Sequence, residues 1–203
     1  MAENFVSRRY SIVSSAIELI SELGLSGLTT HNLAEKENMS EALLYKYFSG
    51  IDEVLIEVVD YYFSFDESIR RTVASKEGTS IDKIVEYFDA YATYYDNYYA
   101  ISTLMLQYEE LLHNINTREK VSTCIAERRE FLSGLFQKAI DDKEILNSMT
   151  SDELAGDVSG MLMAHILNRR ILYHKKTFKQ EFMDNLNRWL DLLRISVEKG
   201  EKV

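Results

Sequence analysis

The stretch SEALLYKYFSG, residues 40–50, concentrates side chains that can bind an anion on one short element. Tyr45 and Tyr47 supply hydroxyl groups and Lys46 supplies an ammonium group, and all three can donate hydrogen bonds to phosphate oxygens. Glu41 is the exception, because it places a negative charge near the start of the same element. The composition therefore raises two questions: whether this stretch contacts a nucleic acid, and what the carboxylate of Glu41 does there.

The elements expected to hold this stretch are helices. A long amphipathic helix is expected over residues 7–23, where apolar side chains recur every three or four positions until Gly24. Thr29 can cap a short second helix, and Ser40 can cap a third. Only three residues lie between the last two helices, and one of them, Asn38, tolerates the left-handed backbone of a tight turn. This is the outline of a helix-turn-helix unit.

The rest of the chain also has helical patterns. It contains no proline and only eight glycines, so few residues interrupt long helices. We expect an all-α protein of about nine helices, the later ones over residues 51–74, 80–97, 100–113, 117–142, 151–175 and 178–198.

Charge and composition restrict the cellular setting and the partners. The 203 residues carry a net charge of −10, which argues against broad, sequence-independent binding to nucleic acid. Residues 1–48 hold four basic and six acidic side chains, so this part is less acidic but not basic. A single cysteine, Cys124, excludes an internal disulfide. The first residues lack the apolar core of a signal peptide, and no apolar run is long enough to span a membrane. A soluble, cytoplasmic protein without a membrane partner is expected.

The N-terminal region resembles the TetR/AcrR-like family of bacterial transcriptional regulators over roughly residues 8–58. The resemblance is carried by RRYSIVSSAIELISELG, then TTHNLA, then MSEALLYKYF. It implies a helix-turn-helix DNA-binding domain over residues 1–50 and a helical effector-binding and dimerisation domain over 51–203. By position, the family's DNA contacts correspond to Thr29, His31, Ser40, Glu41, Ala42, Leu43, Tyr45, Lys46 and Tyr47.

Three positions depart from the family's pattern. Ile51 stands where members usually have a lysine that binds phosphate, His31 stands where arginine is frequent, and Glu41 introduces an acid. Fewer cationic contacts should lower the affinity for DNA and flatten its salt dependence. Glu41 can accept a hydrogen bond from a cytosine amino group, or it can interact with the positive end of its own helix.

Seven of the thirteen tyrosines lie between residues 87 and 108. They can form a core with hydroxyl groups that reach water, or they can line a pocket for an apolar or aromatic small molecule. The family resemblance favours the pocket, because the ligand cavity of its members lies among the middle helices. The candidate ligand-binding residues are Tyr87, Tyr91, Tyr94, Tyr98, Met105, Tyr108, Phe131, Met161 and His165.

Small residues four apart, Gly156, Gly160 and Ala164, form a ridge that favours a close helix crossing. In the resembled family the last two long helices form a homodimeric four-helix bundle. The candidate dimer interface is the ridge together with Phe182, Leu186, Trp189 and Leu193; the alternative is that these residues pack in an internal core.

No catalytic constellation is found, because the four histidines are scattered and no ordered nucleophile–base set appears. An enzyme, a metal site and a cofactor are therefore not expected. The resemblance implies a homodimeric repressor that binds a palindromic double-stranded DNA operator and is released by a small-molecule effector. The alternative is a helical adaptor protein of the same fold with weak or lost operator binding.

Overall fold

The computed structural model describes residues 2–146, 148–172 and 175–194 of the chain. Within these residues the backbone forms ten α-helices and two short 3₁₀ helices and contains no β-strand, apart from one isolated bridge between Ile145 and Arg194. The expected all-α class is confirmed.

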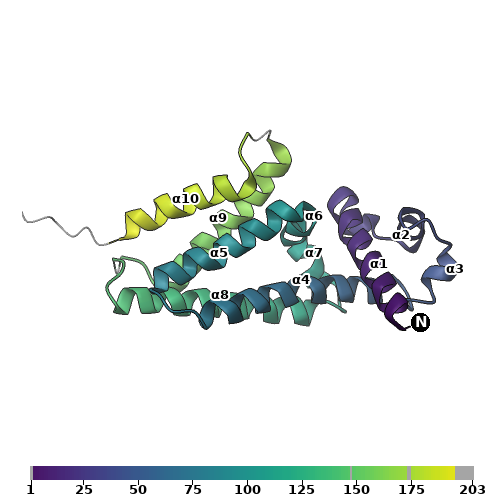
Figure 1. Cartoon of the computed structure of the whole chain (residues 1–203), viewed down its shortest axis with the longest axis horizontal. Helices are drawn as coiled ribbons and strands as arrows, with labels where there is room; N and C mark the ends of the chain where they lie inside the picture. Colours follow the sequence, from purple (N-terminus) through teal and green to yellow (C-terminus); the bar gives the residue numbers. More distant parts are fainter. Residues whose placement is uncertain (1, 147, 173–174, 195–203) are drawn as a thin grey trace, which may run out of the picture. The chain divides into compact units, whose positions relative to one another are not determined.

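The helices follow one another along the chain as labelled in Figure 1. They are α1 (Ala2–Leu23), η1 (Leu25–Gly27), α2 (Thr30–Lys36), α3 (Glu41–Leu44), α4 (Ile51–Ala74), α5 (Ser80–Asn97), α6 (Tyr99–Ser102), η2 (Thr103–Gln107), α7 (Tyr108–His113), α8 (Arg118–Asp141), α9 (Ser151–Ile171) and α10 (Phe178–Leu193).

Two helix predictions need correction within the described residues. Helix α1 begins at Ala2 and not at residue 7, because residues 2–6 contain no glycine or proline that would interrupt it. The helix expected over 100–113 is divided into α6, η2 and α7. There the hydroxyl groups of Ser102 and Thr103 donate to the carbonyls three residues earlier, at 2.7 and 2.8 Å, and such bonds compete with regular helix bonding. The expected helical residues 173–174 and 195–198 lie outside the described residues.

The chain divides into two compact units. Unit 1 comprises Met1–Ser68 and Asn97–Ala126, and unit 2 comprises Ile69–Asp96 and Glu127–Val203. This division, which follows the contacts within the chain, differs from the boundary expected after residue 50. That boundary separates two expected functions, DNA binding and effector binding, and stays a prediction. Helices α4 and α8 each contribute residues to both units.

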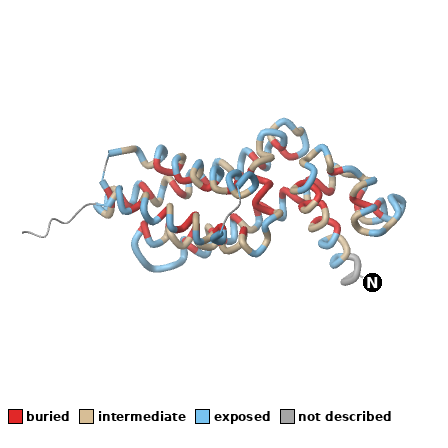
Figure 2. Tube along the Cα trace, turned by 90° about the horizontal axis from the view of Figure 1, so that it is seen from above, coloured by how far each residue is buried: buried red, intermediate tan, exposed pale blue. Residues whose placement is uncertain are grey.

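The core of unit 1 holds the short helices α2 and α3 against α1. Leu33 of α2, Leu44 of α3 and Phe48 are buried with the apolar face of α1 that includes Ile12 and Ile20. Buried and exposed positions follow one another along each helix in Figure 2, as expected for amphipathic helices. Leu44 and Phe48 of the stretch SEALLYKYFSG therefore belong to the core.

The core of unit 2 is aromatic. The rings of Phe178 and Phe182 on α10 stack with their centroids 5.8 Å apart, and Phe88 and Tyr95 of α5 approach them at 5.6 and 5.9 Å. At the start of α10 the carboxylate of Asp96 accepts hydrogen bonds from the backbone N–H groups of Phe178 and Lys179, at 2.9 and 3.0 Å. Asp96 therefore satisfies donors that every helix N-terminus leaves free and fixes α10 to the end of α5.

Candidate nucleic-acid interface

Local hydrogen bonds define the helix-turn-helix unit. The side chain of Thr29 accepts from the N–H of Asn32 at 3.1 Å, and that of Ser40 accepts from the N–H of Leu43 at 3.2 Å. Asn38 has a φ of 52°, the left-handed conformation expected of it in the turn. Both caps and the turn are formed as the sequence indicates.

The side chains of the third helix divide into a buried and an exposed face. Leu44 faces the core, whereas Ala42, Leu43, Tyr45 and Lys46 are exposed. Tyr45 is 54% exposed, and its hydroxyl group is therefore accessible to a partner. The α-helical part of this element is short, Glu41–Leu44, and the backbone then continues through turns to Phe48, so Tyr45–Tyr47 lie on turns and not in a regular helix.

Glu41 ties the third helix to the second. Its carboxylate accepts a hydrogen bond from the hydroxyl group of Thr30 at 2.9 Å and lies 3.6 Å from Nδ1 of His31. Both partners belong to the first turn of α2. The acid that is unusual for this position therefore serves as a link between the two helices that should meet DNA, a role that neither sequence interpretation included.

Most cations of the DNA-binding region are already paired. Arg8 binds Glu37 at 2.9 Å, Arg9 binds Glu53 at 2.8 Å, and Lys36 lies 3.2 and 3.1 Å from Glu18 and Glu22. Within residues 2–50, Lys46 is the basic side chain for which the structure shows no acidic partner. Any attraction that this face exerts on phosphate depends strongly on Lys46, because the other charges are neutralised at short range.

A buried acid in the turn was missed by the sequence analysis. The Glu37 side chain is 6% exposed and accepts hydrogen bonds from Arg8, Ser11 and Ser15 of α1. These three donors are spaced by three and four residues, so they lie on one face of α1. Polar residues at such a spacing also occur on the solvent-facing side of an amphipathic helix, so the sequence did not indicate that a buried acid meets them.

A second acid connects residues 40–50, here called the recognition element, to α4. Glu53 accepts from the backbone N–H and the hydroxyl group of Ser49, at 2.6 and 2.9 Å, and from Arg9 at 2.8 Å. These contacts, above all the Ser49 backbone hydrogen bond, lower the pKa of Glu53 from 4.5 to about 2. Arg9 also donates to Glu57 and to the carbonyl of Tyr47, and its guanidinium lies 4.0 Å from the centre of the Phe48 ring. Arg9 thus joins α1, the recognition element and α4 at one point.

The candidate ligand-binding residues fall into two groups. Tyr87, Tyr91, Tyr94, Phe131, Met161 and His165 lie in unit 2, and Tyr98, Met105 and Tyr108 lie in unit 1. In unit 2 the Tyr87 ring lies 5.0 Å from Tyr91 and 5.5 Å from Phe131. In unit 1 the Tyr108 hydroxyl lies 3.0 Å from that of Tyr62, and Tyr98 lies 3.1 Å from the Ser14 hydroxyl.

Arg128 is a buried residue of unit 2 that the sequence analysis did not select. Its guanidinium donates to the Tyr91 hydroxyl at 3.0 Å and lies 5.2 Å from the centre of that ring. It introduces a cation into the aromatic cluster. Arg128 falls in the three- and four-residue spacing of the buried positions Val121, Cys124 and Leu132 of α8, whereas the exposed Arg129 does not. This spacing was the signal that could have identified Arg128.

The candidate dimer residues differ in exposure. Gly160 and Ala164 of α9 are exposed and Gly156 is half-buried, whereas Phe182 and Leu186 of α10 are fully buried inside unit 2. Trp189 and Leu193 are half-buried. The two buried residues pack within this chain, whereas Gly160 and Ala164 leave part of α9 exposed.

Neither a metal centre nor a membrane span is found in the part of the chain that the structure describes. No group of three or more histidine, cysteine or acidic side chains there can hold a metal ion. No helix among the described residues has the length and apolar character needed to cross a membrane.

Together, the capped second and third helices and the left-handed turn form a helix-turn-helix unit, which a larger helical region follows. Comparison with known families agrees: residues 12–58 match the family described as bacterial regulatory proteins, tetR family. The sequence matches no curated protein. The resemblance to the TetR family is confirmed, and the chain has the TetR-like fold.

Solved structures of transcriptional regulators share this fold over nearly the whole chain. The ketosteroid transcriptional regulator KstR2 of Mycobacterium tuberculosis has a TM-score of 0.83 at 14% identity, covering 93% of this chain and 96% of its own. FadR of Bacillus subtilis, solved with stearoyl-CoA, has a TM-score of 0.69 at 17% identity, with coverages of 92% and 98%. AibR, solved with isovaleryl coenzyme A and operator DNA, has a TM-score of 0.73 at 15% identity, with coverages of 92% and 98%.

Proposed function

We propose that the protein is a dimeric transcriptional repressor that binds a palindromic operator and is released by a small-molecule effector. The observation that carries the DNA-binding part is the exposed face of the recognition element, with Tyr45 and Lys46 accessible while Leu44 and Phe48 anchor it in the core. Tyr45 donates to phosphate, Lys46 supplies the positive charge, and Ala42 and Leu43 reach base edges.

Gel-shift titration with the DNA upstream of the protein's own gene tests this assignment. Lys46→Ala should weaken binding to every sequence and reduce the slope of log affinity against log salt concentration by about 1, as expected for one lost phosphate contact. The matched control is Lys138→Ala, which removes an exposed lysine of α8. If Lys46→Ala leaves the gel shift unchanged, the DNA-binding surface lies elsewhere on the protein. If the unaltered protein gives no salt-sensitive gel shift, the repressor assignment is refuted.

A homodimer through α9 is the second part of the proposal. Helix α9 buries Leu154, Val158 and Leu162 on one face, and its opposite face exposes Met163, Leu167 and Ile171 beside the small residues Gly160 and Ala164. A helix that is apolar on both faces requires a second partner to cover the exposed one. A dimer also supplies two recognition elements for half-sites about one helical turn apart.

Sedimentation velocity tests the dimer. Leu167→Asp should convert a dimer to a monomer, whereas Ile115→Asp, at a position of unit 1 that is 80% exposed, should not. A monomeric unaltered protein at micromolar concentration contradicts this part of the proposal, and so does a dimer that Leu167→Asp leaves intact.

The effector is proposed to bind at the aromatic cluster of unit 2 around Tyr87, Tyr91 and Phe131, with Arg128 as a nearby cation. An apolar molecule with an anionic group suits such a set of side chains. Two solved structures of this fold contain acyl-coenzyme A molecules, stearoyl and isovaleryl, which makes these thioesters reasonable first probes. A probe that raises the melting temperature and dissociates the DNA complex is expected, and Phe131→Ala should weaken both effects.

The adaptor protein remains the second candidate, favoured by one observation. Arg8, Arg9 and Lys36 are neutralised by acids within the chain, which leaves little positive charge for DNA. If the adaptor assignment holds, the protein is dimeric but gives no specific gel shift at low salt, with or without acyl-coenzyme A.

A further inference from the structure

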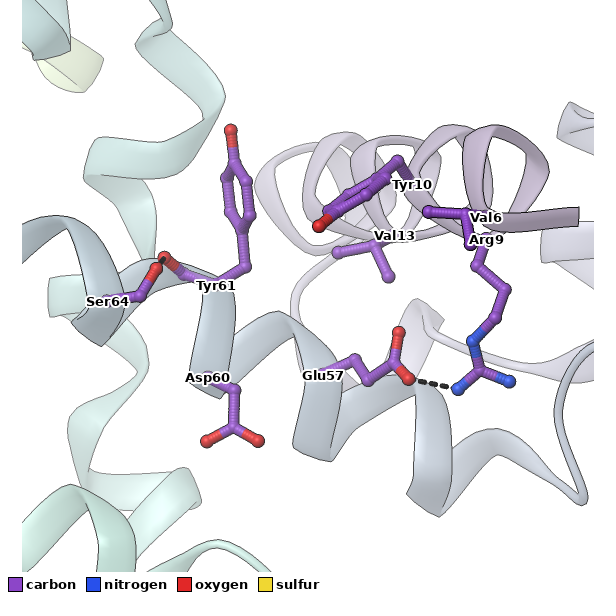
Figure 3. A pocket seen from close by; sticks show the side chains of 8 residues that line it. All are labelled: Val6, Arg9, Tyr10, Val13, Glu57, Asp60, Tyr61 and Ser64. Atoms are coloured by element: carbon purple, nitrogen blue, oxygen red, sulfur yellow. Dashed lines mark hydrogen bonds and ion pairs between the residues drawn. The ribbon is translucent and has the colours of Figure 1, made fainter. Parts of the chain in front are cut away.

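A groove on the surface of unit 1 lies between α1 and α4. Figure 3 shows Val6, Tyr10 and Val13 of α1 facing Glu57 and Tyr61 of α4. The groove has a volume of about 430 Å³. A neighbouring hollow shares Tyr10, Val13 and Tyr61 of the groove's lining. Spaces of this size suit a small organic molecule.

The walls combine exposed aromatic rings with excess negative charge. Tyr10 is 62% exposed and Tyr61 is 38% exposed, so both rings are available to a ligand. Arg9 is the basic residue among the described residues that line the groove, and it is shared by the carboxylates of Glu57 and Glu53. Two carboxylates on one guanidinium leave this cluster with a net charge of −1. Asp60, also at the groove, lies 3.0 Å from Lys120 and forms a neutral pair with it.

We propose that this groove binds a small organic cation with an aromatic or apolar body, such as an arylalkyl quaternary ammonium ion. The body lies against Tyr10, Val13 and Tyr61, where the electron-rich faces of the tyrosine rings attract the positive charge. The ammonium group neutralises the remaining charge of the Glu53–Glu57–Arg9 cluster. A carboxylate or phosphate ligand is disfavoured at the same place, because it meets unbalanced acids.

The groove is connected to the recognition element by one residue. Glu57 lines the groove and accepts from Arg9, and Arg9 donates to the carbonyl of Tyr47, next to Lys46. A cation that attracts the Glu57 carboxylate weakens its bond to Arg9 and so loosens the support of Tyr47. This consequence, a lower affinity for DNA, rests on the proposed function, whereas cation binding itself does not.

Saturation-transfer NMR and calorimetry with benzyltrimethylammonium test the site on the full chain. Binding is expected for this cation and not for phenylacetate, which has a similar body and the opposite charge. Tyr61→Ala should weaken binding about two- to five-fold, the usual effect of one exposed cation–aromatic contact. Glu57→Gln should weaken it by up to about five-fold, the usual effect of one exposed ion pair. Tyr99→Ala is the matched control, because Tyr99 is 40% exposed in the same unit but does not line the groove.

The proposal is overturned if the cation does not bind or if phenylacetate binds equally well. It is also overturned if Tyr61→Ala and Glu57→Gln are both folded and bind the cation with unchanged affinity. Circular dichroism melting verifies that each variant is folded, and Tyr61→Phe keeps the ring and should bind like the unaltered protein. If the cation binds but leaves a gel shift unchanged, the site stands and its connection to DNA binding fails. If no DNA binds at all, calorimetry still decides whether the site exists.

Discussion

The acid Glu53 is expected to stabilise unit 1 only while it is ionised, and Glu53→Gln isolates this effect. Glutamine keeps an oxygen that can accept from Ser49 but removes the charge that attracts Arg9. A pKa lowered from 4.5 to about 2 corresponds to about 3 kcal/mol at neutral pH if no solvent screened the charge. Because the Glu53 side chain is 36% exposed, screening reduces this to about 1–2 kcal/mol.

The sign of the pH dependence follows from the lowered pKa of Glu53. Above pH 4.5 the carboxyl group is ionised in both the folded and the unfolded chain, and the full stabilisation is present. As the pH falls toward 2, the unfolded chain takes up a proton first, so the stabilisation is progressively lost. By pH 3 less than half of it should remain.

Urea unfolding followed by circular dichroism, at pH 7 and pH 3, measures the free energy of unfolding of the unaltered protein and of the Glu53→Gln variant. The difference between them should be about 1–2 kcal/mol at pH 7 and less than half of that at pH 3. Asp52→Asn is the matched control, an exposed acid of the same helix turn, and should change the free energy by less than about 0.5 kcal/mol. A difference that does not vary with pH would refute the assignment of the stabilisation to the Glu53 charge.

Three further substitutions test contacts within the units: Glu37 and Glu41 belong to unit 1, and Asp96 belongs to unit 2. Glu37→Ala removes the carboxylate that pairs with Arg8 and accepts from two serines of α1, while Arg8 keeps its hydrogen bond to the backbone carbonyl of residue 37. It should lower the free energy of unfolding by about 2–3 kcal/mol in urea melts, whereas a loss below about 0.5 kcal/mol would show that water replaces the contact. Glu41→Gln removes a negative charge beside the proposed DNA contacts and should raise DNA affinity in gel shifts, most clearly at low salt; a lower affinity would mean that the link to Thr30 matters more than the charge. Asp96→Ala removes the acceptor at the start of α10 and should cost about 1–2 kcal/mol, with faster amide hydrogen exchange in the first turn of that helix; unchanged exchange at Phe178 would contradict the capping role.

The helix-turn-helix unit was predictable because its determinants are close in the sequence. Thr29 and Ser40 cap through hydrogen bonds to residues three positions ahead, and Asn38 adopts its turn by its own backbone preference. The buried positions of Leu44 and Phe48 follow from the spacing of apolar residues. The charged residues gave less information, since an acid such as Glu41 or Glu37 looks the same in a sequence whether it faces solvent or a partner.

By itself, the sequence determined the all-α class, the caps and the tight turn, because each depends on residues within about one helical turn of one another. Only the tertiary structure decided that Glu37 is buried under α1, that Arg9 joins three elements, and which candidate dimer residues are already covered. These outcomes depend on side chains that are more than twenty positions apart in the chain, such as Arg8 and Glu37. Whether such groups meet is set by how the helices pack, and periodicity along one helix contains no information about the helix that packs against it.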